Sequence, residues 1–289
     1  MKELEIFNQY RPLMLSVAYR MLGSLMDAED IVQEAFLRWS RTVPDEVQSA
    51  KAYLSTIVTR LCIDQLRSTQ AQREVYVGPW LPEPLITEQF PDVADTIEKA
   101  DSLSLAFLVV LESLSPVERA VFLLREIFDY DYPEVAQIVG KSEANCRQMV
   151  HRARQHLAVH RPRFDVSPAQ REKLTRQFFA ACTQGDLPGL IGLLTEDIVL
   201  TADGGGKVSA ATRPVYGPHN VARFVIGLAR KAPPDTVYRF AQINGQTGLI
   251  YYVNQKIDGV MVLDIVGEQI RSIQNVRNPD KLRAMPPLN

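Results

Sequence analysis

The feature that most constrains this chain is a change of residue pattern near residues 161–163. Before it, apolar residues recur at the three- and four-residue steps of helices. Two more helix-like stretches follow, and then short segments rich in β-branched and aromatic residues, separated by turn dipeptides. We therefore expect a multidomain protein, with all-α domains followed by an α+β domain that holds an antiparallel sheet. The strand segments are 198–203, 237–243, 248–253, 260–266 and 270–276, and the turns are Asn244-Gly245, Asp258-Gly259 and Gly267-Glu268.

A second boundary divides the helical part. Residues 75–95 hold four prolines, and proline fixes φ and lacks an amide hydrogen, so this acidic stretch is expected to be an extended linker and not a helix. A length of 289 residues suits about two domains of ordinary size. The expected segments are helical 1–72, linker 73–100, helical 101–163 and α+β 167–284.

Neither a membrane nor an oxidising compartment is indicated. No apolar run reaches the ~18 residues that span a bilayer, and the N-terminus lacks the stages of a secretory signal. The three cysteines, Cys62, Cys146 and Cys182, are far apart and odd in number. Since such spacing suggests neither a disulfide framework nor a zinc cluster, we expect a cytoplasmic protein.

Residues 115–157 carry the signals of a helix-turn-helix. Ser115-Pro116-Val117-Glu118 is a capping box with proline at the first helical position, and Asp131-Tyr132-Pro133-Glu134 repeats this arrangement. Gly140 can adopt the left-handed backbone conformation that ends a helix, and Ser142 caps a second helix from Glu143 to about Leu157. Two helices joined by a short turn containing glycine form this motif.

The second helix of this pair is a candidate DNA-reading element. Residues 1–165 contain 18 basic and 24 acidic side chains, whereas residues 141–163 contain six basic residues and one acid. Polar side chains at the start of such a helix can reach base edges, and cations further along can neutralise phosphates. The alternative is a solvated polar face in a bundle, but the caps, glycine turn and basic density favour DNA. The candidates are Ser142, Glu143, Ala144, Asn145, Arg147, Gln148, Arg152 and Arg154.

Two earlier segments carry weaker signals. Asp27, Asp30 and Glu34 share one helical face, which is either a solvated stripe or a docking surface for a basic partner. In residues 51–67, cations flank Tyr53, as needed to stack bases and follow a single strand. The alternative for the second segment is that Tyr53, Ile57 and Leu61 are simply core residues.

Catalytic and metal sites are not expected. His151, His156 and His160 lack a completing ligand, and suit polar positions near a DNA-binding helix. In the last block, Asp203, Asp264 and His219 are the candidates for acid–base chemistry, but no partner is evident. We interpret the two aspartates as edge or turn residues, and expect neither catalytic residues nor a cofactor.

The helical blocks, in this order, resemble a bacterial RNA polymerase sigma factor of the extracytoplasmic-function group, over residues 1–163. The segment from Asp27 to Phe36 is similar to the region that docks on the polymerase clamp helices. Residues 51–67 resemble the segment that melts and reads the minus-ten element, and residues 115–160 resemble region four, which reads the minus-thirty-five element near the polymerase flap. The resemblance implies polymerase contacts at Asp27, Glu29, Asp30, Gln33, Glu34 and Phe36, and minus-ten contacts at Lys51, Tyr53, Thr56, Arg60, Asp64 and Arg67.

Three further motifs are Trp80-Leu81-Pro82-Glu83-Pro84 in the linker, the glycine run Asp203-Gly204-Gly205-Gly206-Lys207, and the terminal motif Asn278-Pro279-Asp280-Lys281-Leu282. They resemble the subgroup of these sigma factors with a fused SnoaL-like domain, which implies regulation in cis. They give a regulatory interface of Trp80, Leu81, Pro82, Glu83, Pro84, Asp203, Gly204, Gly205, Gly206, Lys207, Asn278, Pro279 and Asp280. An acidic linker and a C-terminal part with 14 basic and 10 acidic side chains attract each other.

Other interpretations stay open at this point. The glycine run 204–206 could be only a flexible loop, and Trp80 a cover of the core. The protein could also be a one-component DNA-binding regulator, or its C-terminal cone could bind a small ligand or act as an isomerase.

Overall fold

The computed structural model describes residues 2–42, 47–94, 100–160 and 166–288, and the chain divides into two compact units. The expected boundary at Arg161 and Arg163, and linker residues 95–99, lie outside the described residues. The first unit comprises Met1–Glu74, Phe90–Leu103 and Phe107–Arg161, and the second comprises Val75–Gln89, Ser104–Ala106 and Pro162–Asn289.

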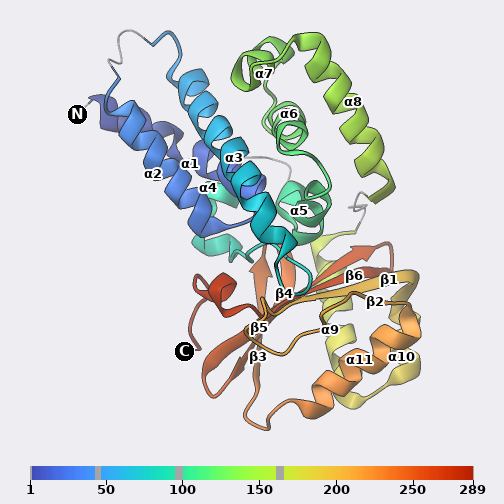
Figure 1. Ribbon diagram of the computed structural model, residues 1–289. Helices are drawn as coiled ribbons and strands as arrows, with labels where there is room; N and C mark the ends of the chain where they lie inside the picture. The colour runs from blue at the N-terminus through green and yellow to red at the C-terminus, as the bar shows by residue number, and fades with distance from the viewer. Residues whose placement is uncertain (1, 43–46, 95–99, 161–165, 289) are drawn as a thin grey trace. The chain divides into compact units, whose positions relative to one another are not determined.

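The first unit is helical (Figure 1). Helix α1 packs on α2 and α3, while α6 packs on α8. The apolar residues expected inside α2 are indeed buried, Ile31, Ala35 and Trp39 among them, and the Trp39 indole donates to the carbonyl of Glu3 at 2.9 Å. The helices are α1 (Lys2–Leu22), α2 (Leu25–Trp39), α3 (Ala50–Glu74), α4 (Pro91–Ala94), η3 (Ala100–Leu103), α5 (Leu105–Leu111), α6 (Pro116–Glu126), α7 (Tyr132–Val139) and α8 (Glu143–His160).

The expected helix-turn-helix is present as α7 and α8. Both capping boxes form, at Ser115 before α6 and at Asp131 before α7. Gly140 ends α7 with φ of 67°, a left-handed conformation that glycine adopts without steric cost. Ser142 then accepts from the amide of Asn145 at 3.3 Å, which caps α8.

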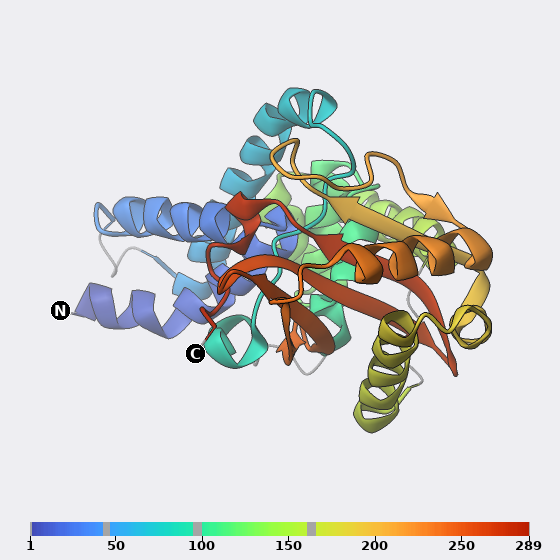
Figure 2. The same ribbon diagram turned by 90° about the horizontal axis from the view of Figure 1, so that it is seen from below.

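The second unit is built on one curved six-stranded sheet in the order β2-β1-β6-β5-β4-β3. Helices α9, α10 and α11 share a hydrophobic core with β1, β5 and β6 (Figures 1 and 2). Its elements are η2 (Thr87–Gln89), α9 (Pro168–Gln184), α10 (Leu187–Leu193), β1 (Leu194–Asp203), β2 (Val215–Tyr216), α11 (Pro218–Lys231), β3 (Val237–Ile243), β4 (Gln246–Val253), β5 (Lys256–Val266), β6 (Gln269–Val276) and η4 (Pro279–Leu282).

The expected fold class, helical domains followed by an α+β domain, is confirmed. One pair of strands differs from the expectation, since β1 and β6 are parallel while the other pairs are antiparallel. These two strands come from opposite ends of the unit, so no hairpin forces them to be antiparallel.

Two local predictions are wrong. Asp258-Gly259 is not a turn but lies inside β5, where the ring of Tyr251 occupies the space a Cβ of residue 259 would need. The turn falls instead at Asn254 and Gln255, with φ of 50° and 62°. The stretch 75–95 is extended only in part, because η2 and α4 form within it, and Pro91 is accommodated at the first position of α4.

Candidate nucleic-acid interfaces and linker clamp

Helix α2 presents the expected acidic surface. Glu29, Asp30 and Gln33 are exposed, whereas Asp27 and Glu34 are half-buried. Glu34 accepts from Arg38 at 2.8 Å, an exposed pair of the ordinary helical i,i+4 kind. Phe36, the sixth predicted contact, is also half-buried and packs edge-on against Phe7, with ring centroids 4.8 Å apart.

The same helix exposes two large apolar side chains that the sequence reasoning missed. Met26 is 51% exposed and Leu37 is 46% exposed. They lie eleven residues apart, about three helical turns, and so share a face with Asp30 and Gln33. The sequence does indicate this surface, because Met26 and Leu37 do not fall on the helical face formed by the buried apolar residues. An exposed surface that combines apolar and acidic groups suits a protein partner.

Five of the six predicted minus-ten residues share one side of α3, whereas Lys51, in its first turn, lies on the opposite side. Lys51, Arg60, Asp64 and Arg67 are exposed. Tyr53 is half-buried, and its hydroxyl shares a hydrogen bond of 3.0 Å with Thr42. Thr56, Ile57 and Leu61 are likewise half-buried, and the ring of Tyr53 lies 5.9 Å from that of the buried Trp39. This partial burial agrees with a core role for Tyr53, Ile57 and Leu61 as well as with contacts to bases.

Arg60 connects this face to the helix-turn-helix within the first unit. Its Nε donates to the carbonyl of Ile138 at 3.0 Å, and its Nη2 donates to that of Gln137 at 3.2 Å. These carbonyls belong to the last turn of α7, where they lack helical partners and attract a cation. Lys51 lies 4.6 Å from the ring centroid of Tyr130. Some of the cations predicted to contact DNA are therefore engaged inside the unit.

Helix α8 separates a buried stripe from an exposed polar face. Cys146, Val150, Ala153 and Leu157 form the buried stripe. Most of the predicted DNA contacts are exposed, and Glu143 and Asn145 are half-buried. The exposed ones are Ser142, Ala144, Arg147, Gln148, Arg152 and Arg154, and the exposed Lys141, His151 and Gln155, absent from the prediction, extend the same surface.

Two of the α8 arginines have partners in the unit. Arg154 binds Glu126 of α6 through two hydrogen bonds, of 2.9 and 2.8 Å. Arg147 pairs with Glu143 at 2.8 Å, and its guanidinium lies 4.9 Å from the ring centroid of Tyr132. Arg154 is thus held in a two-point contact, and Arg147 in an exposed pair that costs little to break.

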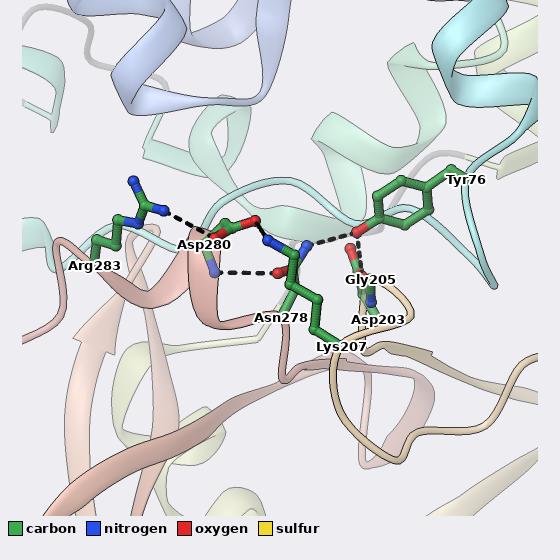
Figure 3. A network of polar contacts seen from close by, with 7 residues as sticks. All are labelled: Tyr76, Asp203, Gly205, Lys207, Asn278, Asp280 and Arg283. Carbon is green, nitrogen blue, oxygen red and sulfur yellow. Dashed lines mark hydrogen bonds and ion pairs between the residues drawn. The ribbon is translucent and has the colours of Figure 1, made fainter.

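In the second unit, the three subgroup motifs converge on Asp203, and Figure 3 shows its contacts with Tyr76 and Gly205. This carboxylate is fully buried at the end of β1. It accepts from the Tyr76 hydroxyl at 2.6 Å, the Leu81 amide at 2.8 Å, the Gly205 amide at 3.0 Å and the Lys281 ammonium at 2.6 Å. We call this set of residues the linker clamp, because it fastens residues 76–81 to the sheet.

Lys281 supplies the positive charge that pairs with the Asp203 carboxylate. Its ammonium also donates to the carbonyl of Leu81 and lies 4.0 Å from the ring centroid of Trp80. Cation–π contacts of this kind stabilise an indole beside a cation. Trp80 is half-buried, and its contact is with Lys281 of the terminal motif. The sequence reasoning named the motif that contains Lys281 but left out Lys281 and Tyr76 as site residues.

Neighbouring atoms lie so close to residues 204–206 that these positions require glycine. A Cβ on Gly205 would lie 2.3 Å from the Asn278 amide nitrogen, and one on Gly206 would lie 3.1 Å from Val77. Gly205 and Gly206 also adopt φ of 58° and 70°. A Cβ on Gly204 would meet the carbonyl of Val208 at 2.5 Å.

The terminal motif contacts both Tyr76 of the linker and Lys207 of the glycine run. Asn278 donates to the Tyr76 hydroxyl at 2.8 Å, and Lys207 pairs with Asp280, which also accepts from Arg283 at 2.9 Å (Figure 3). The hydrogen bond and charge of Lys207 lower the pKa of Asp280. Burial, followed by the bond to Asp203, raises the pKa of Tyr76, so its hydroxyl remains a donor.

A second attachment of the linker was not predicted. Leu85 donates its amide to the Asn244 side chain at 2.9 Å and accepts from the Asn244 amide at 2.8 Å. Gly245 donates to Thr87 at 2.9 Å. The β-turn Asn244-Gly245 thus binds the linker as well as reversing the chain. Of the remaining predicted interface residues, Pro82, Glu83 and Pro84 are buried and Pro279 begins η4.

The interpretation of Asp203 and Asp264 as edge or turn residues is wrong. Both are buried, and they lie on β1 and β5, which are inner strands of the sheet. Asp264 accepts from Arg271 at 2.9 Å. Burial raises the pKa of Asp264, and the nearby charge of Arg271 offsets only part of that increase. His219 is exposed at the start of α11. Asp203 pairs with Lys281 and Asp264 pairs with Arg271, so neither carboxylate is an unpaired general base.

Within the described part of the chain, no three His, Cys, Asp or Glu side chains gather as metal ligands. Cys62, Cys146 and Cys182 are free thiols, and all three are buried. In the same residues, no helix combines the length and the apolar character needed to cross a membrane.

Comparisons with known proteins agree with this arrangement. The Sigma-70 region 2 family matches residues 6–72, and the Sigma-70 region 4 family matches residues 104–157. The ECF RNA polymerase sigma factor SigJ of Mycobacterium tuberculosis H37Rv is 36% identical over 98% of this chain and 94% of that protein. The probable ECF RNA polymerase sigma factor SigI of the same strain is 32% identical over 96% of this chain and 95% of its own length.

The match extends to three dimensions. The crystal structure of the extracytoplasmic function sigma factor SigJ from M. tuberculosis aligns with a TM-score of 0.79 and 33% identity, covering 98% of this chain and 99% of that one. The resemblance inferred from the motifs is confirmed over the whole chain, and a one-component regulator is not favoured. The chain belongs to the extracytoplasmic-function RNA polymerase sigma factors.

Proposed function

We propose that this protein binds core RNA polymerase in the cytoplasm, directs it to promoters, and has no chemistry of its own. The observation that carries the proposal is the similarity to ECF sigma factors over 98% of the chain. The exposed mixed face of α2 would dock on the polymerase, α3 would capture minus-ten bases, and α8 would read the minus-thirty-five element.

Strand opening needs no catalytic group under this proposal. Unstacking a base costs a few kcal/mol, which contacts to the captured base and backbone offset. Tyr53 and the cations of α3 supply stacking and charge for that purpose. Asp203 and Asp264, the two candidates for acid–base chemistry in the sheet, are each held by a cation, which supports a binding role over catalysis there.

The experiment that tests polymerase binding is co-purification of the full chain with core RNA polymerase. A sigma factor forms a stable complex with core enzyme and binds duplex promoter DNA weakly when alone. A chain that binds duplex DNA tightly by itself and ignores core enzyme would be a one-component regulator, and the proposal would fail.

We propose further that the second unit regulates the sigma regions in cis through the linker clamp. The clamp supports this because it fixes the segment that lies, in sequence, between the two family matches. Restraining that segment limits how the two helical regions can be placed on a promoter.

Gly205→Ala tests the clamp. The new Cβ would collide with Asn278, so the variant is expected to release the linker and change the amount of promoter-directed transcript made with purified polymerase. Gly267→Ala is the matched control, because Gly267 has the same left-handed backbone, φ of 59° against 58°, with nothing near its Cβ. Equal transcription from both variants would remove the support for regulation in cis.

A further inference from the structure

The second unit contains a cavity of about 220 Å³, separate from the clamp carboxylate. Its walls are mostly apolar and come from α9, α11 and the sheet, with Phe179, Val225, Leu249 and Met261 among them. Since a cavity of about 150 Å³ lined by apolar side chains admits benzene, this one has room for a single ring with a short substituent.

One end of the cavity is polar. Tyr251 donates its hydroxyl to Asn275 at 2.7 Å, and Arg277 pairs with Asp258 at 2.6 Å. Burial raises the pKa of Tyr251, so its hydroxyl stays protonated. A few convergent polar groups in an otherwise apolar pocket are the usual arrangement of a small-molecule site.

Arg277 retains an unused donor. Its Nη1 and Nη2 donate to Ser209 and Asp258, whereas its Nε, although buried, meets no acceptor within the described residues. This buried Nε has almost no surface that a water-sized atom could reach, so it is not the donor that a ligand would meet. A guanidinium has five N–H donors, and these two bonds leave a second hydrogen on Nη1 and on Nη2. A bound molecule with a carbonyl or carboxylate oxygen would accept from that side of Arg277.

The thiol in the cavity wall is not suited to covalent capture. Cys182 lines the wall, and burial raises the pKa of its thiol to about 12, so the thiol is protonated at neutral pH. The proposed ligand would therefore not be held through Cys182.

The polar end is directly joined to the linker clamp. The backbone carbonyl of Asp203 accepts from the amides of Arg277 at 2.7 Å and Asn278 at 2.9 Å. Its carboxylate holds Leu81 and Lys281. A group that orders Arg277 thus acts on the residue that fastens the linker.

We propose that this cavity binds a small monocyclic molecule with one carbonyl or carboxylate group, whose oxygen accepts from Arg277, and that occupancy tightens the linker clamp. Binding stands on the cavity itself. Its regulatory consequence rests on the proposed regulation in cis.

Binding is tested by calorimetric titration of the full chain with three probes. Acetophenone carries a neutral carbonyl, benzoate a carboxylate, and ethylbenzene no acceptor. One of the first two is expected to bind about tenfold or more tightly than ethylbenzene, the effect of one hydrogen bond to a charged donor. Their order distinguishes a carbonyl ligand from an acid. Binding of all three with equal strength, or of none at millimolar concentration, would overturn the proposal.

The location is tested by filling the cavity. Ala229→Trp places an indole at the wall formed by α11 and should reduce probe affinity about tenfold or more. Arg223→Trp is the matched control, because Arg223 is an exposed residue of the same helix that does not line the cavity. In the unsubstituted protein, the methyl NMR signal of Met261 should shift on probe addition, independently of how either variant folds. An unmoved Met261 signal contradicts the location.

Hydrogen exchange of residues 75–89 tests the regulatory consequence. The bound probe is expected to slow exchange there in the parent protein and not in Ala229→Trp. Binding without slower exchange would overturn the coupling. A failure of polymerase binding would instead refute the proposed function and leave the probe titration unchanged, so the two failures are distinguishable.

Discussion

At the scale of single residues, Asp203 explains why three distant motifs occur in one chain. A buried carboxylate is stable only when its lone pairs and charge are satisfied. Here the linker supplies Tyr76 and the Leu81 amide, the glycine run supplies the Gly205 amide, and the terminal motif supplies Lys281. Each motif provides a donor that the others cannot replace.

Asp203→Asn should loosen the clamp. It removes the charge that faces Lys281 at 2.6 Å, and breaking one side of a buried ion pair costs about 3–5 kcal/mol. The free energy of unfolding of the second unit, followed by Trp80 fluorescence in a Trp39→Phe background, measures the loss. Asp280→Asn is the control, since its exposed pair with Lys207 should cost below about 1 kcal/mol. Equal losses would contradict the assignment of Asp203 as the centre of the clamp.

The thiols give a prediction about pH. Burial raises the pKa of Cys62, Cys146 and Cys182, and for Cys182 to about 12. Because the unfolded thiol has a pKa of about 8.5, stability from this source is complete below that pH and is lost as the pH rises toward the native value. At pH 8 the native protein should react slowly with a disulfide reagent and quickly in urea. Rapid labelling of a native thiol would contradict this burial.

At the scale of elements, local signals predicted more than long-range ones. Capping boxes, Gly140 and the β3 segment 237–243 were predicted correctly, because each depends on neighbours in the sequence. The dipeptide Asp258-Gly259 predicts a turn, and nothing nearby in the sequence shows that the ring of Tyr251 packs over Gly259 inside a strand. Lys281 and Tyr76 were missed for the same reason, as their shared partner Asp203 is far from both in the chain.

Leu37 makes helix α2 testable as a docking element. Leu37→Asp places a charge on the exposed apolar part of the face and should weaken binding to core RNA polymerase about tenfold or more, while the helical circular dichroism stays unchanged. Leu4→Asp is the matched control, because Leu4 of α1 is similarly exposed, at 51% against 46%. If both variants bind equally well, α2 is not the docking surface.

At the scale of the whole molecule, the chain combines a helical unit that carries the proposed polymerase and DNA surfaces with a sheet unit that holds residues 76–81. The first 165 residues carry six more acidic than basic side chains, and the remainder four more basic than acidic. This contrast suits a linker retained by its own C-terminal unit. The proposed division of labour is recognition by helices and control by the clamp.

Run-off transcription with purified core RNA polymerase and a promoter library tests the central claim most directly. The account predicts that adding the full chain produces transcripts from a small set of promoters sharing two sequence elements, and that core enzyme alone does not. Transcription that is the same with and without the chain would contradict it.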